Sequence, residues 1–117
     1  MKFLAALVAL ATPTFAHADD WHGIWTTDPS ACQYKDMIGE HDPTPVLYSA
    51  TSFIGYEVRC DVKRSERIST LPAWRITLSC MGEGMSYDEE RLLMISEDGR
   101  LWEFDGVWEP MGFTRCE

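Results

Sequence analysis

Two segments near the middle of the chain alternate between apolar and polar residues. The apolar positions of the first segment are Ile54, Tyr56, Val58, Cys60 and Val62. Those of the second segment are Trp74, Ile76, Leu78 and Cys80. A period of two residues is typical of a β-strand with one buried side and one solvent-facing side. The pattern therefore predicts strands over residues 54–63 and 74–80, connected by a loop that contains Pro72.

The two predicted strands define a register if they form one antiparallel hairpin centred on Thr70. That register places Cys60 opposite Cys80. The other pairs it creates are Val62 with Leu78, Arg64 with Ile76, Asp61 with Ser79, and Lys63 with Thr77. Opposed Cα atoms in an antiparallel pair lie about 4.5–5.5 Å apart, a spacing that a disulfide can bridge. Among the possible connectivities of the cysteines we therefore predict Cys60–Cys80 and, by elimination, Cys32–Cys116.

Shorter apolar runs between turn signals complete the pattern. Asp98-Gly99 and Asp105-Gly106 are hairpin signals, because both central residues of a type I′ turn need a positive φ. Further strands are predicted over residues 21–25, 46–50, 90–95, 100–104 and 111–116, and residues 28–45 are expected to form a long loop with one helical turn at 29–32. The sequence thus predicts an all-β domain of about seven strands with two disulfides, either a small antiparallel barrel or a curved meander.

The first 18 residues, MKFLAALVALATPTFAHA, have the layout of a cleavable secretory signal. Lys2 precedes an apolar run that ends at Ala11, and Ala16-His17-Ala18 is a small-x-small cleavage site. A membrane anchor is the competing interpretation, but an anchor needs about 20 apolar residues and Thr12 interrupts the run. We therefore expect a signal peptide over residues 1–18 and a single mature domain over 19–117. The mature protein would then be periplasmic or secreted, with no membrane anchor.

Export affects how the cysteines are interpreted. An even number of cysteines in a small exported domain indicates a disulfide framework. A zinc site built from all of them is the alternative. Zinc sites take their ligands from close pairs such as C-x2-C, and the positions Cys32, Cys60, Cys80 and Cys116 include no such pair.

The mature domain is strongly acidic. Removal of residues 1–18 changes the formal charge from −9 to −10, because Lys2 is lost while all 19 acidic residues remain. Phosphate recognition draws most of its affinity from Lys and Arg, so nucleic acid and anionic membranes are not expected as partners. The charge is compatible with a basic exported protein as partner, and equally with a role in solubility alone.

Several short motifs resemble those of known small exported proteins. They are Gly23-x-Trp25, Trp74-Arg75, Cys80 followed by Glu83-Gly84, and the Asp98-Gly99 turn. Together they resemble small exported bacterial proteins with a lipocalin-like or inhibitor-like β-barrel. Exported lysozyme inhibitors are similar in size, signal peptide and disulfides, although their Ser-Gly-x-x-Tyr loop does not occur here. The resemblance implies a small barrel and names no activity.

Sequence signatures of catalysis do not occur in the chain. It contains no Gly-x-Ser-x-Gly elbow and no Walker or dinucleotide fingerprint. Cysteines in disulfides cannot supply a thiolate nucleophile. The candidate metal ligands are Asp20, His22, Glu40, His41 and Asp42, but a solvated polar loop is the more frequent explanation for such residues. We therefore expect a protein that is not an enzyme and that has no cofactor and no metal.

An acidic cluster follows the predicted disulfide hairpin, in a segment interpreted as a loop. Its members are Glu83, Met85, Tyr87, Asp88, Glu89 and Glu90. One interpretation is a solvated turn whose charges keep a sheet edge from pairing with other chains. The other is an anionic loop with an aromatic anchor that docks into a basic partner.

The five tryptophans are explained either by core packing or by a ligand pocket at a barrel mouth. Trp102 and Trp108 are the candidates for such a pocket, because a turn at Asp105-Gly106 would place them on neighbouring strands. The resulting hypothesis is an exported non-catalytic binding module, an inhibitor or modulator of a basic secreted hydrolase such as a lysozyme or protease. A small-ligand-binding barrel and an exported structural protein are the alternatives.

Overall fold

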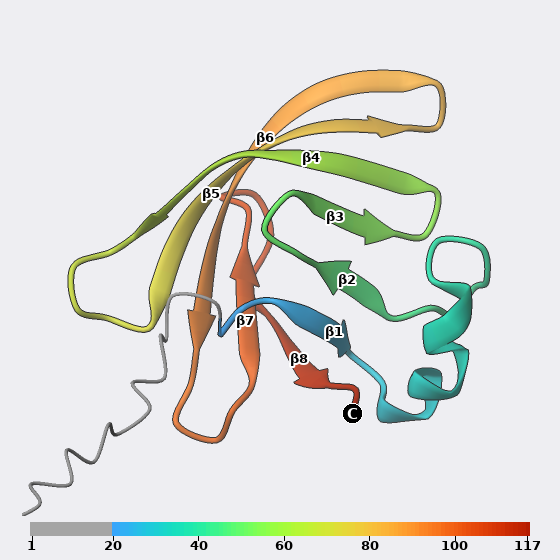
Figure 1. The fold of residues 1–117 in the computed structure, drawn as a ribbon, viewed down its shortest axis with the longest axis horizontal. Coiled ribbons are helices and arrows are strands. Elements are labelled where there is room, and N and C mark those ends of the chain that lie inside the picture. Colours follow the sequence, from blue (N-terminus) through green and yellow to red (C-terminus); the bar gives the residue numbers. More distant parts are fainter. Residues whose placement is uncertain (1–19) are drawn as a thin grey trace, which may run out of the picture.

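The computed structural model describes residues 20–117, which form a closed antiparallel barrel (Figure 1). Its eight strands pair in chain order, and the last returns to pair with the first. The elements are β1 (Gly23–Thr26), the 3-10 helix η2 (Pro29–Met37), β2 (Val46–Tyr48), β3 (Ser52–Gly55), β4 (Val58–Arg67), β5 (Ala73–Gly82), β6 (Met85–Ile95), β7 (Leu101–Phe104) and β8 (Met111–Arg115). The predicted all-β barrel with two disulfides is confirmed. The signal peptide expected over residues 1–18 lies outside the described residues.

The strand predicted over residues 54–63 is two strands. Strand β3 ends at Gly55 and β4 begins at Val58, with Gly55 opposite Val58 across a two-residue turn. Glu57 in that turn has a φ of 55°. The apolar–polar alternation runs through the turn without a break, because the turn contains two residues, which is one full period. The apolar positions nevertheless change face there, since Ile54 and Val58 lie on opposite faces of the sheet. This turn accounts for the eighth strand.

The predicted β4–β5 register is correct up to a β-bulge. Cys60 lies opposite Cys80, Asp61 opposite Ser79, and Val62 opposite Leu78. The register then shifts by one between Val62 and Arg64, so that the pairs become Arg64 with Thr77 and Ser65 with Ile76. The predicted pairs Arg64–Ile76 and Lys63–Thr77 are therefore wrong, because the bulge inserts one extra residue into β4.

Side chains fill the interior of the barrel. The buried cluster consists of Trp21, Trp25, Tyr48, Phe53, Cys60, Trp74, Ile76, Leu78, Cys80, Leu93, Leu101 and Phe113.

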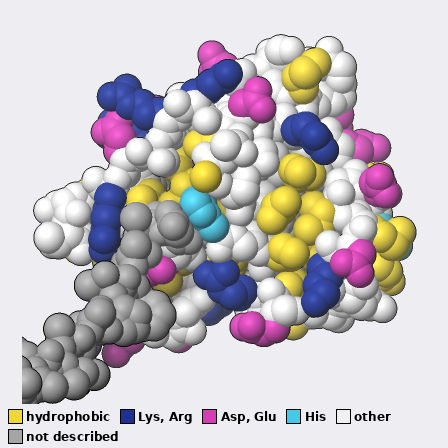
Figure 2. Space-filling view, in the orientation of Figure 1, with side chains coloured by type: hydrophobic (Ala, Val, Ile, Leu, Met, Phe, Trp, Pro, Cys, Tyr) yellow, Lys and Arg dark blue, Asp and Glu magenta, His cyan; other side chains and the backbone are white. Residues whose placement is uncertain are grey.

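On the outer face, Ile24, Leu47 and Ile54 lie side by side across β1, β2 and β3. Figure 2 shows apolar side chains gathered over these strands. The helical part of residues 20–117 contains no segment with the length and hydropathy of a membrane-spanning helix.

One end of the barrel is closed around Trp25 by Arg115. The Arg115 guanidinium lies 4.2 Å from the centroid of the Trp25 ring. Its Nη1 donates to the His22 carbonyl and its Nη2 to the Asp20 carbonyl, both at 2.8 Å. A Cβ at Gly23 would lie 2.3 Å from Arg115 Nη1. The Gly-x-Trp motif therefore has a physical basis here, because the glycine leaves room for the arginine that covers the tryptophan.

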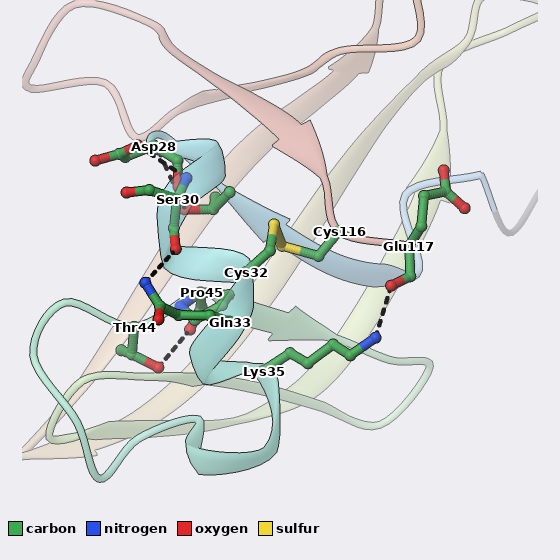
Figure 3. The surroundings of a disulfide bond; sticks show 10 residues. Asp28, Ser30, Cys32, Gln33, Lys35, Thr44, Pro45, Cys116 and Glu117 are labelled. Carbon is green, nitrogen blue, oxygen red and sulfur yellow. Dashed lines mark hydrogen bonds between the residues drawn. A yellow bond between two sulfur atoms is a disulfide. The ribbon is translucent and has the colours of Figure 1, made fainter.

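The helix η2 is fastened to the end of the chain (Figure 3). It begins at an N-cap in which Asp28 Oδ1 accepts from the Ser30 N–H at 3.0 Å, and it is longer than the single helical turn predicted at 29–32. Cys32 is joined to Cys116 by the predicted disulfide, and Lys35 Nζ donates to the Glu117 carbonyl at 2.7 Å. The loop between β1 and β2 is thereby held against the barrel.

Candidate functional site

The acidic cluster lies mostly in a strand, so the prediction of a loop is wrong. Gly82 pairs with Met85 across a two-residue turn, and only Glu83 and Gly84 lie in it. Both turn residues have positive φ, 51° and 76°. The acidic residues are rare strand formers, but this part of β6 is exposed to water, which removes the cost of placing charge there.

Alternation along β6 divides the cluster between two faces. Asp88 and Glu90 pair with Ser79 and Thr77 of β5 and lie on the outer face. Tyr87 and Glu89 lie on the inner face, opposite Cys80 and Leu78, and Glu89 bonds to Arg91. The acids available to a partner are therefore Glu83, Asp88 and Glu90. Glu89 is engaged with the barrel itself.

An ionic network inside the barrel was missed at the sequence level. Its centre is the buried guanidinium of Arg91, which contacts Glu89, donates from Nη1 to Tyr48 Oη at 2.7 Å, and lies 3.6 Å from Glu103. Tyr48 donates to Glu103 at 2.5 Å. The arginine also lies 4.2 Å from the Phe53 ring centroid. The sequence did hold a signal for this network. Arg91 lies two residues before Leu93, so the alternation of a strand places its side chain on the same inward face.

Burial and charge set the protonation states of this network. Burial raises the pKa of Tyr48 well above its usual value, and the Glu103 carboxylate adds to that effect. Burial lowers the pKa of Arg91, but Tyr48, Glu103 and Glu89 outweigh it and raise that pKa overall. Tyr48 therefore remains neutral and Arg91 charged, as a structural clamp between β2, β6 and β7 requires.

Two turns lie together at one end of the barrel and form what we call the tip surface. It consists of Tyr56 and Glu57 from the β3–β4 turn and of Glu83, Met85 and Tyr87 from the β5–β6 hairpin. These residues line a hollow of about 250 Å³. A Cβ on Gly82 would lie 3.1 Å from the Glu57 carbonyl oxygen, which shows how closely the turns approach. In Figure 1 both turns point to the right.

The tip surface combines exposed apolar groups with negative charge. Met85 is 65% exposed, Tyr56 45% and Tyr87 41%. The carboxylate of Glu57 raises the pKa of Tyr56, and partial desolvation and Asp42 act in the same direction. Asp42 therefore adds to the negative potential at this end.

Trp102 and Trp108 do not form the expected pair. Trp102 lies on β7, on the outward side opposite Met94 and Gly112, with its Nε1 donating to Ser96 Oγ at 3.2 Å. Trp108 lies in the β7–β8 loop and is 74% exposed. The predicted two-residue hairpin at Asp105-Gly106 is wrong, because β7 ends at Phe104 and β8 begins only at Met111. The Asp105 side chain instead accepts hydrogen bonds from the Val107 and Trp108 N–H groups within this longer loop.

The two histidines among the candidate metal ligands pack against aromatic rings. His41 stacks on Tyr34 with ring centroids 3.8 Å apart, and His22 packs against Trp21 at 4.2 Å. Among residues 20–117, no three His, Cys, Asp or Glu side chains lie close enough to share a metal ion. All four cysteines are disulfide-bonded. The two disulfides indicate an oxidising environment.

Comparison with known protein families, curated proteins and solved structures gives no match to this chain.

Proposed function

We propose that this protein is an exported, non-catalytic binding module whose tip surface docks on a basic exported protein such as a lysozyme or protease. The observation that carries the proposal is the composition of the tip surface. Three half-exposed apolar side chains, Tyr56, Met85 and Tyr87, stand beside the carboxylates of Glu57 and Glu83.

This composition suits protein binding. Tyrosine and methionine are enriched at protein interfaces. Tyrosine supplies contact area there at low entropic cost, because its side chain has only two torsions. Carboxylates around them steer a positively charged partner and accelerate its association. The two turns are also fixed relative to each other, because β4 pairs with both β3 and β5. A fixed surface loses little conformational freedom on binding.

Export is supported by the disulfides. Both predicted bridges are formed, and such bridges persist where the surroundings are oxidising. The secretory layout of residues 1–18 supports the same location. The periplasm or the exterior of the cell is also where basic hydrolases would meet this protein.

The test is a binding titration of the protein purified from the exported fraction against basic lysozymes and proteases, at low and at physiological salt. We expect a complex that weakens as salt rises, because screening acts on exposed charges. The double variant Glu57→Lys/Glu83→Lys should lower the association rate about tenfold or more. Glu97→Lys/Asp98→Lys changes the charge equally in the β6–β7 turn, at the other end of β6, and should bind like the wild type.

Two results would contradict the proposal. One is no complex with any of these hydrolases at low salt. The other is an equal loss of binding in both double variants, which would mean that total charge and not the tip surface decides the interaction.

A further inference from the structure

Strand β6 is longer than β7, the strand that pairs with it on one side. Strand β5 pairs with β6 from Met85 to Met94, whereas β7 pairs with β6 only from Leu92 to Ile95. Within the described part of the chain, residues 85–91 therefore have no neighbouring strand on the β7 side. Figure 1 shows the β5–β6 hairpin continuing past the end of β7. We call residues 85–91 on this side the free edge.

The hydrogen-bond pattern identifies the backbone groups at the free edge. Ile95 N donates to the Pro72 carbonyl on the β5 side at 2.9 Å. Ser96 N donates to the Arg100 carbonyl on the β7 side, also at 2.9 Å. Because an antiparallel strand directs alternate residues to its two neighbours, odd-numbered residues of β6 bond to β5. The N–H and C=O groups of Ser86, Asp88 and Glu90 consequently point to the free edge.

A hollow of about 380 Å³ lies where β7 ends and the free edge begins. Leu92 and Phe104 provide apolar walls, Glu90 and Asp105 provide acidic groups, and Arg75 lies on the β5 side. Beyond Asp105, the β7–β8 loop exposes Val107 and Trp108. An extended chain following the free edge toward β7 would thus meet a recess and two apolar side chains.

Charge determines which chain can pair there. Asp88 and Glu90 are exposed on the outer face of the free edge. Two copies of this edge paired with each other would bring acids opposite acids, an arrangement that destabilises a sheet. A strand with Lys or Arg at alternate positions would place opposite charges across from Asp88 and Glu90.

We propose that the free edge of β6 binds a basic extended segment of the partner protein by strand addition, in line with β7 and beyond Phe104. This inference rests on the proposed function, because it specifies how the basic partner is held. The main-chain bonds to Ser86, Asp88 and Glu90 would supply affinity, and the acidic side chains would select a basic sequence.

The direct test is amide hydrogen exchange of the full protein with a short peptide of alternating lysine and valine. We expect slower exchange at Ser86, Asp88 and Glu90 on binding, with little change at Met85, Tyr87 and Glu89, which already bond to β5. A peptide of alternating glutamate and valine should produce no such pattern. Uniform protection along residues 85–91, or none with the lysine peptide, would overturn the proposal.

A matched pair of variants tests the same edge through the backbone. Ser86→Pro removes one edge N–H without changing charge or the bonds to β5, whereas Ser86→Ala keeps that N–H. We expect Ser86→Pro to weaken peptide binding about tenfold and Ser86→Ala to bind like the wild type. Thermal unfolding of both variants checks that each is folded, and the exchange test on the wild type does not depend on either variant.

The outcomes separate this inference from the proposed function. If Glu57→Lys/Glu83→Lys loses the hydrolase while Ser86→Pro retains it, docking by the tip surface stands and strand addition is wrong. If the lysine peptide protects the alternate amides but no basic hydrolase binds, the free edge binds a basic strand and docking of a hydrolase on the tip surface is wrong. A smaller solution size of Ser86→Pro than of Ser86→Ala would mean that the edge pairs copies of this chain, which also overturns the inference.

Discussion

The two ends of the barrel are built from the same sheet but differ in what holds them. At one end, Trp25 is buried beneath Arg115, whose guanidinium bonds to two main-chain carbonyls. At the other end, the β3–β4 and β5–β6 turns project into water with positive-φ glutamates, Glu57 and Glu83. The first end gains stability from long-range contacts. The second retains exposed apolar and acidic groups, which stability alone does not explain.

This difference indicates a division of roles within a small domain. A domain of this size has a net stability of about 5–15 kcal/mol, so cross-links and buried contacts must be concentrated where they constrain most of the chain. The Cys32–Cys116 bridge closes almost the whole described chain, with a sequence separation of 84. The free edge and the tip surface can then remain exposed without loss of the fold.

The largest effect is expected from removing the long-range bridge. Cys32→Ser/Cys116→Ser should lower the free energy of unfolding by about 4–5 kcal/mol, because the loop it closes is long. Cys60→Ser/Cys80→Ser, with a separation of 20, should cost about 3 kcal/mol. Denaturant unfolding of both variants measures the difference. A larger loss from the shorter loop would show that the bridges do not act through chain entropy and would weaken the proposed division of roles.

The next effect concerns Arg91, which lies between the two ends. Arg91→Met should destabilise the protein by about 3 kcal/mol, because Glu103 and Tyr48 would lose their buried partner. The partial exposure of Glu89 and Glu103, 25% and 19% of their side chains, keeps the cost at the low end for such pairs. Arg75→Met, on the exposed face of the neighbouring strand, is the control and should change stability by less than about 0.5 kcal/mol. Equal losses would mean that the buried network stabilises the protein no more than an exposed arginine does.

Local patterns predicted the parts of the fold that depend on neighbouring residues. The alternation in 74–80 gave β5, and the register of two strands gave Cys60 opposite Cys80. The second bridge followed by elimination. The turn at Tyr56 and Glu57 was missed because neither of its central residues is Gly or Asn, although Gly55 directly precedes it. The bulge near Lys63 was missed because no residue type marks it in the sequence.

The candidate site was predicted in composition but not in shape. The acidic residues from Glu83 to Glu90 were identified, yet their distribution over two faces requires the β6 register. Tyr56 and Glu57 were not identified as part of the candidate site, because only the folded barrel brings the β3–β4 turn beside the β5–β6 turn. Arg115 was not identified as the partner of Gly23-x-Trp25, because 90 residues separate it from Trp25 and only barrel closure brings them together.

The smallest effect comes from one glycine at each end. Gly23 has a φ of +144° and its Cβ position is occupied by Arg115, whereas Gly84 has a φ of +76° with no atom within 4 Å. Gly23→Ala should therefore cost about 2 kcal/mol, since it adds backbone strain and displaces Arg115 from Trp25. Gly84→Ala adds strain alone and should cost about 1 kcal/mol. Thermal unfolding compares the two variants, and near-ultraviolet circular dichroism reports on the tryptophan environment, which only Gly23→Ala should change. If Gly84→Ala proved the more damaging of the two, the β5–β6 turn and not the Arg115 contact would be the part of the barrel on which stability depends.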